Sequence, residues 1–221
     1  MCAIFGSFDR SMFEVLHEAN KERGNFASSM VTIGLEDVYI GKFEGNIDFD
    51  KVRYSSDFCY VTGHVQAPTS SMREWSYDTS HPFESLSWIV SHNGVLTNES
   101  EIKKHYVPYV VNPVDTALIV ELLQYFTDNE DKKPDPVKAI IKTLNILQGT
   151  FALSIIDSDT GEIYLARSGS ILHYDKNGNF STKPGTGYKK LPEGVIMRLN
   201  KKTRRWNKVG VFEVKSPFLF L

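Results

Sequence analysis

The second residue of the chain, Cys2, is the side chain whose type and position best fit a nucleophile. A small residue at position 2 normally permits removal of the initiator methionine, which leaves the cysteine with a free α-amine. That amine has a pKa of about 7.7–8, so near neutral pH it can act as the base for its own thiol. The alternative is that Cys2 simply packs in a terminal strand, because free cysteine is among the most buried residue types.

A second candidate for chemistry is the pair Asn93-Gly94, which follows a predicted buried strand over residues 86–92. The Asn93 side-chain amide and the Gly94 backbone N–H could converge on one oxygen as an oxyanion hole. One such donor contributes about 10²–10³ to the rate of an acyl transfer. The alternative is an ordinary tight turn, for which Asn-Gly is the strongest short signal.

Two further polar groups stand at predicted element ends. His64 and Gln66 close a predicted strand over residues 58–66, where they either contact a ligand or fill the core. Asp115 begins a predicted apolar helix over residues 114–126, where it either caps the helix or offers its carboxylate to a cation.

Hydrophobic periodicity predicts the elements that must position these groups. A strand over residues 1–8 carries Cys2, and a helix capped by Ser11 ends at Arg23-Gly24, with Gly24 as a left-handed cap. Strands apolar on both faces, then helices, then strands again predict a single α+β domain of packed layers over residues 1–221. The third predicted helix lies within residues 136–147, and the other predicted strands lie within residues 27–45, 150–157, 162–167, 171–175, 179–183, 195–199 and 205–214.

Composition excludes several classes of protein. With 25 Lys and Arg against 27 Asp and Glu, the 221-residue chain has no global field to attract nucleic acid or anionic membrane. Two cysteines are too few for a disulfide scaffold. No apolar run approaches the roughly 18 residues of a membrane span, and no secretory signal is present. We therefore expect a cytoplasmic protein.

Neither a metal nor a cofactor is expected. Cys59, His64, His81 and His92 lack the close ligand spacing of a zinc site. The glycine-containing stretch at residues 184–187 lacks the lysine and the following helix of a phosphate loop.

Taken together, the motifs resemble those of the class II glutamine amidotransferases, which are N-terminal nucleophile hydrolases. The resemblance covers nearly the whole chain, and its specific part is the N-terminal cysteine with a downstream His-Asn-Gly. The matching segments are Met-Cys-Ala-Ile-Phe-Gly at 1–6, Arg-Gly at 23–24, Gly-His-x-x-Ala-Pro-Thr at 63–69, His-Pro-Phe at 81–83, His-Asn-Gly-Val-Leu-Thr-Asn at 92–98 and Val-Asp-Thr at 114–116.

The resemblance implies a four-layer αββα sandwich with the nucleophile at the end of a central strand. It also implies that a thiolate attacks the glutamine γ-amide, releases ammonia and leaves a thioester, which water hydrolyses to glutamate. The roles it assigns are Cys2 as nucleophile, Asn93 and Gly94 as oxyanion hole, Arg23 and Gly24 as support for the nucleophile's loop, Asp115 as partner of the substrate α-amine, Thr69 as part of the substrate loop, and His81 as a structural or catalytic residue.

One departure from the family pattern is Gln66, because the family usually has an Arg there that pairs with the substrate α-carboxylate. Glutamine carries no charge and no bidentate fork. Affinity for free glutamine is then expected to fall by about 10–100-fold unless another cation substitutes. Two alternatives stay open: an amidohydrolase acting on a γ-glutamyl conjugate, and an inactive binding or regulatory protein of the same fold.

The family's synthase domain has no counterpart within these 221 residues. The expected partner is therefore a separate ammonia-accepting synthase, and the expected substrate is glutamine or a γ-glutamyl compound.

Overall fold

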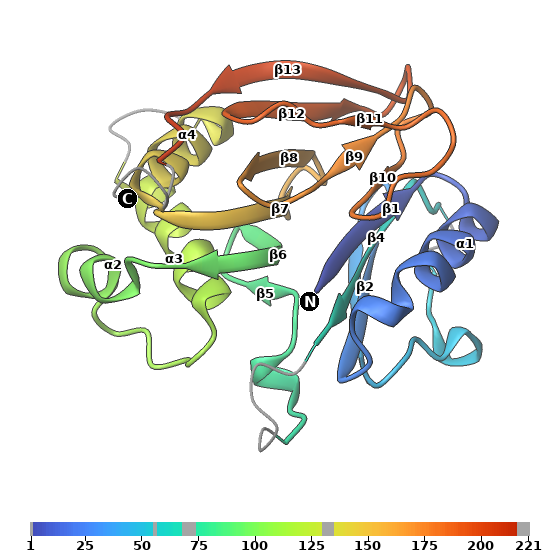
Figure 1. The fold of residues 1–221 in the computed structure, drawn as a ribbon, viewed down its shortest axis with the longest axis horizontal. Helices are drawn as coiled ribbons and strands as arrows, with labels where there is room; N and C mark the ends of the chain where they lie inside the picture. Colours follow the sequence, from blue (N-terminus) through green and yellow to red (C-terminus); the bar gives the residue numbers. More distant parts are fainter. Residues whose placement is uncertain (1, 55–56, 68–73, 130–134, 216–221) are drawn as a thin grey trace.

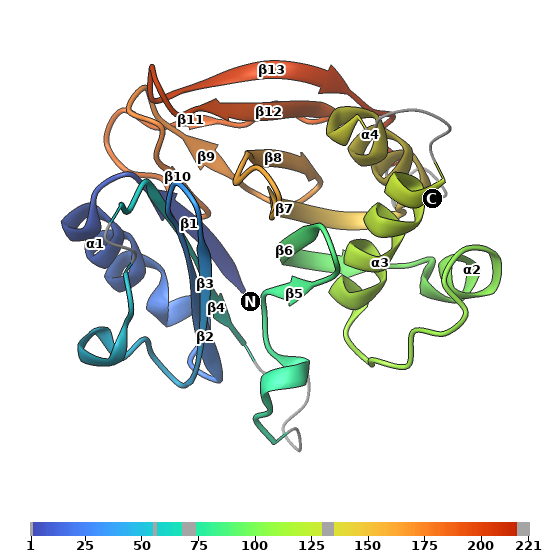
Figure 2. The same ribbon diagram turned by 180° about the vertical axis from the view of Figure 1, so that it is seen from behind.

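The structure is a computed structural model that describes residues 2–54, 57–67, 74–129 and 135–215. Two antiparallel sheets pack face to face, and helices cover both outer faces (Figures 1 and 2). This arrangement confirms the predicted αββα sandwich.

The first sheet has the strand order β11-β9-β10-β1-β4-β2-β3, with β1 and β4 near its centre. Ala3 pairs with Val65 in antiparallel register, so Cys2 comes next to the end of β4. Helix α1 (Arg10–Asn20) and the short 3₁₀ helix η1 (Lys21–Arg23) lie on its outer face. The strands are β1 (Ala3–Ser7), β2 (Ala27–Ile33), β3 (Val38–Glu44), β4 (Tyr60–Gln66), β9 (His173–Tyr174), β10 (Phe180–Ser181) and β11 (Lys189–Lys190).

The second sheet has the order β13-β12-β8-β7-β6-β5, and α3 and α4 cover its outer face (Figure 1). Its strands are β5 (Phe83–Glu84), β6 (Trp88–Leu96), β7 (Gly149–Asp157), β8 (Ile163–Ser168), β12 (Val195–Asn200) and β13 (Arg205–Val211). The helices on this side are α2 (Glu99–His105), α3 (Asp115–Asp128) and α4 (Pro136–Ile146), and two more 3₁₀ helices, η2 (Phe49–Lys51) and η3 (Tyr77–Thr79), lie in loops.

Three apolar cores fill the spaces between the layers, and strand alternation assigns each side chain to one of them. In β1, Ile4 packs between the sheets, while Phe5 packs under α1. In β6, Ile89 packs between the sheets, while Val90 packs under α3 and α4. The same alternation turns Asn93 toward the first sheet.

Helix α1 begins two residues earlier than predicted and ends differently from the prediction. Asp9, rather than Ser11, caps it by accepting the Met12 N–H at 2.8 Å. Gly24 has φ −166°, which is extended and not left-handed, because η1 separates the helix from it.

The turn interpretation of Asn93-Gly94 is wrong. Both residues lie inside β6 and pair with Ala152 and Phe151 of β7. Two other predictions also differ from the structure. Strand β3 is partly exposed because it forms a sheet edge, and the short helix α2 was not predicted.

Candidate active site

Cys2 lies immediately before β1, whose first residue stands at the end of the strand nearest β5 (Figures 1 and 2). Its carbonyl oxygen accepts a hydrogen bond from Arg23 Nε at 3.0 Å. Burial raises the pKa of the Cys2 thiol; the Ala67 backbone N–H and the Arg23 charge oppose that rise, and the Asp115 charge adds to it. Arg23 and Asp115 are therefore both within electrostatic reach of the sulfur.

Gly24 is required by a close approach of two chain segments. A Cβ at this position would overlap the backbone of Gln66 and Ala67 at the end of β4. The neighbouring Phe26 N–H also bonds to the Gln66 carbonyl at 3.0 Å. The Arg23-Gly24 segment thus lies directly against the strand end that adjoins Cys2.

Asn93 and Gly94 occupy the part of β6 that precedes α2. Asn93 is 8% exposed, and its side chain makes no hydrogen bond to the residues that the structure describes. A Cβ on Gly94 would collide with the Thr150 carbonyl and lie 2.7 Å from His92 Nε2. Only glycine therefore fits at position 94. The N–H groups of the Asn93 side-chain amide bond to none of the described residues.

Asp115 is the first residue of α3, but it does not cap that helix, whose N-cap is Val114. Its Oδ2 accepts the Leu96 N–H at 3.0 Å, and its Oδ1 lies 3.3 Å from His92 Nδ1. Burial by itself raises the pKa of Asp115, but the hydrogen bond and charge of His92, together with the Leu96 N–H, outweigh it. The pKa lies below its usual value, so the carboxylate is ionised at neutral pH.

Gln66 is 2% exposed, and its amide is occupied by protein groups. Its Oε1 accepts hydrogen bonds from the His81 backbone N–H at 3.2 Å and from His81 Nδ1 at 3.1 Å. Its Nε2 donates to the Thr79 carbonyl at 3.4 Å. Gln66 and His81 therefore hold each other beside the nucleophile. Thr69, expected in the substrate loop, lies outside the described residues.

His64 is a buried histidine that ties the sheets together. Its Nε2–H donates to the His92 carbonyl at 3.1 Å, and its ring stacks on His81 with centroids 4.0 Å apart. Burial lowers the pKa of His64 to about 3, so the ring is neutral. Of the two interpretations of this residue, the core histidine is the one that its contacts support.

Two residues of this cluster, Thr116 and His92, were given no role in catalysis or substrate binding from the sequence. Thr116 is fully buried and contacts both His81 and His92, and the His92 ring contacts Asp115. The only signal for either residue was its place beside Asp115 or Asn93 in a motif.

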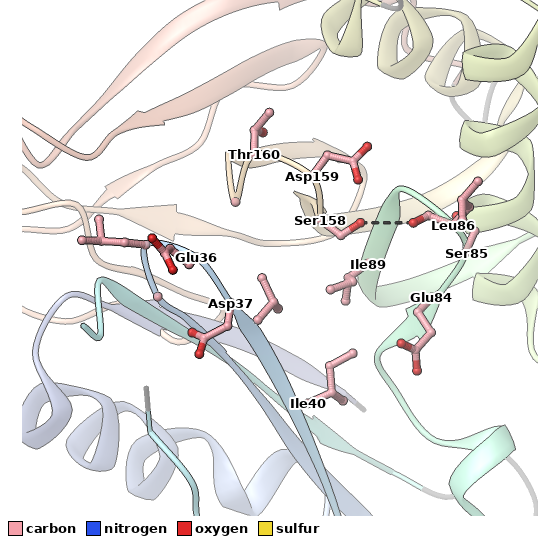
Figure 3. A pocket seen from close by; sticks show the side chains of 14 residues that line it. Glu36, Asp37, Ile40, Glu84, Ser85, Leu86, Ile89, Ser158, Asp159 and Thr160 are labelled. Carbon is pink, nitrogen blue, oxygen red and sulfur yellow. Dashed lines mark hydrogen bonds between the residues drawn. The ribbon is translucent and has the colours of Figure 1, made fainter. Parts of the chain in front are cut away.

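A separate cleft of about 340 Å³ opens where the β2–β3 and β7–β8 turns approach β5 (Figure 3). None of the predicted site residues lines it. Its walls carry four carboxylates and no Lys or Arg: Glu36, Asp37, Glu84 and Asp159. The cleft therefore does not belong to the cluster around Cys2.

No group of three or more His, Cys, Asp or Glu side chains among the described residues could hold a metal ion. No helix in the same residues is long and apolar enough to cross a membrane.

Comparison with curated proteins finds similarity to glutamine–fructose-6-phosphate aminotransferases. The Staphylococcus aureus (strain Mu50) protein is 30% identical over 184 residues, and the Oceanobacillus iheyensis protein is 28% identical over 183 residues. Each match covers 78% of this chain and 30% of the relative, so the chain matches less than a third of each relative's length. No family model matches the chain.

Comparison with solved structures finds the same fold. Glutamine phosphoribosylpyrophosphate amidotransferase from Bacillus subtilis aligns with a TM-score of 0.74 at 17% identity, over 95% of this chain and 49% of that one. A predicted glutamine amidotransferase from Pseudomonas aeruginosa aligns with a TM-score of 0.57 at 14% identity, over 94% and 95% of the two chains.

Proposed function

Because the chain belongs to the class II glutamine amidotransferases, we propose that it hydrolyses the γ-amide of glutamine and supplies the ammonia to a separate synthase. One observation carries this proposal. Cys2, Arg23 and Asp115 come together at one end of the layer between the sheets, and Asn93 faces that layer from β6.

The proposed reaction starts with attack of the Cys2 sulfur on the γ-carbonyl carbon. Ammonia leaves with the proton that the thiol gave up, and water then hydrolyses the thioester to glutamate. Burial raises the pKa of the Cys2 thiol, so attack needs a base within reach. A free α-amine on Cys2 would be that base, which requires removal of Met1.

The other residues stabilise charges that form or bind during this reaction. The Asn93 amide and the Gly94 N–H are the proposed donors to the oxyanion of the tetrahedral intermediate. The Asp115 carboxylate is the proposed partner of the substrate α-ammonium, and its lowered pKa keeps it anionic. Arg23 would hold the main chain of the nucleophile through the Cys2 carbonyl.

A second candidate function follows from Gln66. This residue stands where the family has an arginine, and its neutral amide is held by His81 and Thr79. Such a group does not neutralise a substrate α-carboxylate. A γ-glutamyl compound whose α-carboxylate is masked, hydrolysed with release of an amine, is therefore the competing substrate class. His81 then acts by positioning Gln66, and Thr69 keeps its proposed place in the substrate loop.

The test is glutamate release from protein whose Cys2 terminus has been verified by intact mass. Glutamine, α-amidated glutamine and γ-glutamyl amines should be compared at equal concentration. Preference for free glutamine supports the amidotransferase, whereas preference for a masked or conjugated compound supports the amidohydrolase. No release from any of them, despite a processed terminus, would contradict both and favour an inactive binding protein.

A further inference from the structure

A continuous chain of hydrogen bonds runs through the site and connects its two substrate-binding positions. It begins at Gln66, passes through the His81 ring to the Thr116 hydroxyl at 2.8 Å, and continues to His92 Nδ1 at 3.3 Å and to Asp115. Thr116 is 0% exposed, so water does not compete for these bonds. This chain of hydrogen bonds spans the layers of the fold, because Gln66 ends β4 whereas Thr116 and Asp115 begin α3.

Counting donors and acceptors gives this chain a direction. The Gln66 Oε1 atom only accepts, so His81 Nδ1 carries a proton, and in a neutral ring His81 Nε2 is then the bare acceptor. The Thr116 hydroxyl has one proton and two acceptors within reach, His81 Nε2 at 2.8 Å and Asp115 Oδ1 at 3.3 Å. The proton goes to the nearer acceptor, His81 Nε2, and the hydroxyl oxygen is left to accept from His92. The His92 Nδ1–H is therefore shared between Thr116 Oγ1 and Asp115 Oδ1.

We propose that Thr116 is a positioning residue that couples the two substrate-binding positions of this site. Its hydroxyl fixes the His81 tautomer that holds Gln66 and, on its other side, anchors the His92 N–H against the Asp115 carboxylate. This proposal rests on the proposed function, in which Asp115 binds the substrate α-ammonium. Thr116 itself does not touch the reacting atoms.

The charged surroundings of Asp115 determine what loss of this hydroxyl would do. The groups that act on the carboxylate are His92 from β6, Glu99 from α2 and the Cys2 thiol. Glu99 and Cys2 are acidic groups, so among these three only His92 favours the ionised form of Asp115. Weaker anchoring of His92 should therefore raise the Asp115 pKa and weaken substrate binding without changing the attack on the γ-carbonyl.

Thr116→Val keeps the shape of the side chain and removes the hydroxyl. We expect KM for the preferred substrate to rise about 5–10-fold with kcat within about twofold, and the acid limb of kcat/KM to move to higher pH. Thr116→Ser, which restores the hydroxyl, should return KM and the acid limb of kcat/KM toward their wild-type values. An unchanged KM in Thr116→Val, or an equal defect in Thr116→Ser, would overturn the proposal.

The chain offers a matched control in Thr143. This residue of α4 is also 0% exposed, and its hydroxyl has no partner among the described residues. Thr143→Val therefore makes the same chemical change in a buried helix without cutting a network, and KM and the pH profile should not move.

A measurement on the wild-type protein covers the case in which Thr116→Val fails to fold. Nitrogen-15 chemical shifts of His81 should show a protonated Nδ1 and a bare Nε2. The opposite tautomer would contradict the direction of the chain and overturn the proposal. This measurement needs no turnover. An inactive protein with the expected tautomer would therefore contradict the proposed function and still support the chain of hydrogen bonds.

Discussion

The polar cluster around Cys2 and the acidic cleft of Figure 3 lie at opposite ends of β2 and β7. At the Cys2 end, the Asp115 carboxylate is partly buried and accepts hydrogen bonds from Leu96 and His92. In the cleft, Glu36, Glu84 and Asp159 are exposed, and no Lys or Arg lines the walls.

The difference shows why concavity and charge do not by themselves identify an active site. Exposed carboxylates are solvated by water, and their mutual repulsion is screened by salt. Partly buried groups must find protein partners, and those partners fix their orientation and protonation state. The four predictions below test this difference, in order of the size of the expected effect.

The largest effect is expected for Cys2→Ala, which removes the proposed nucleophile. Hydrolysis should fall by more than about 10⁴-fold, since no other group can form the thioester. Cys59→Ser is the matched control, because Cys59 is half-buried and its Sγ bonds to the Asp57 carbonyl. Glutamate release measures both variants, and a defect confined to Cys59→Ser would reverse the assignment of the nucleophile.

Asn93→Ala should lower kcat by about 10²–10³, the loss expected for one oxyanion donor. The Asn93 side chain makes no hydrogen bond to the described residues, so its truncation should shift Tm by only a few degrees. Kinetics and thermal melts on the same preparation decide the matter. Full activity, or a collapse of Tm in step with activity, would mean that Asn93 serves the fold instead.

The stability of the fold should depend on pH through His64. The pKa of His64 is about 3 in the folded protein against an ordinary 6.5. The contribution of the neutral ring to the free energy of unfolding is therefore fully present above pH 6.5 and is lost as the pH falls toward 3. Lowering the pH from 7.5 to 5 should therefore reduce the free energy of unfolding by about 2 kcal/mol through His64. Urea denaturation of wild type and His64→Gln at both pH values measures it. An equal loss in both proteins would exclude His64 as the source.

The smallest effect is expected in the acidic cleft. Glu36→Gln and Asp159→Asn should change the unfolding free energy by no more than about 0.5 kcal/mol, in the stabilising direction, because each removes a like charge. Urea denaturation at low and high salt should show the gain shrinking with salt, and hydrolysis should be unchanged. A loss of activity in either variant would break the distinction between the two regions.

Sequence patterns predicted the strands and helices of the layers well, because these elements depend on residues that are neighbours along the chain. Runs that are apolar on both faces predicted β4 and β6, and Pro136 was the predicted start of α4, where Asp135 caps the helix by accepting the Val137 N–H at 3.0 Å. The same reasoning failed at Gly24. There the conformation is dictated by contact with Gln66, which lies 42 positions further along the chain.

What the sequence by itself determined was which residues are proposed to carry the chemistry: a cysteine at position 2, an Asn-Gly after a buried run, and an aspartate at a helix start. Only the tertiary structure decided that Gln66 holds His81 and that Thr116 connects His81 to His92. These partners are separated by 15, 35 and 24 positions. No periodicity spans such separations, because the partners meet through the packing of one sheet on the other and of α3 on β6.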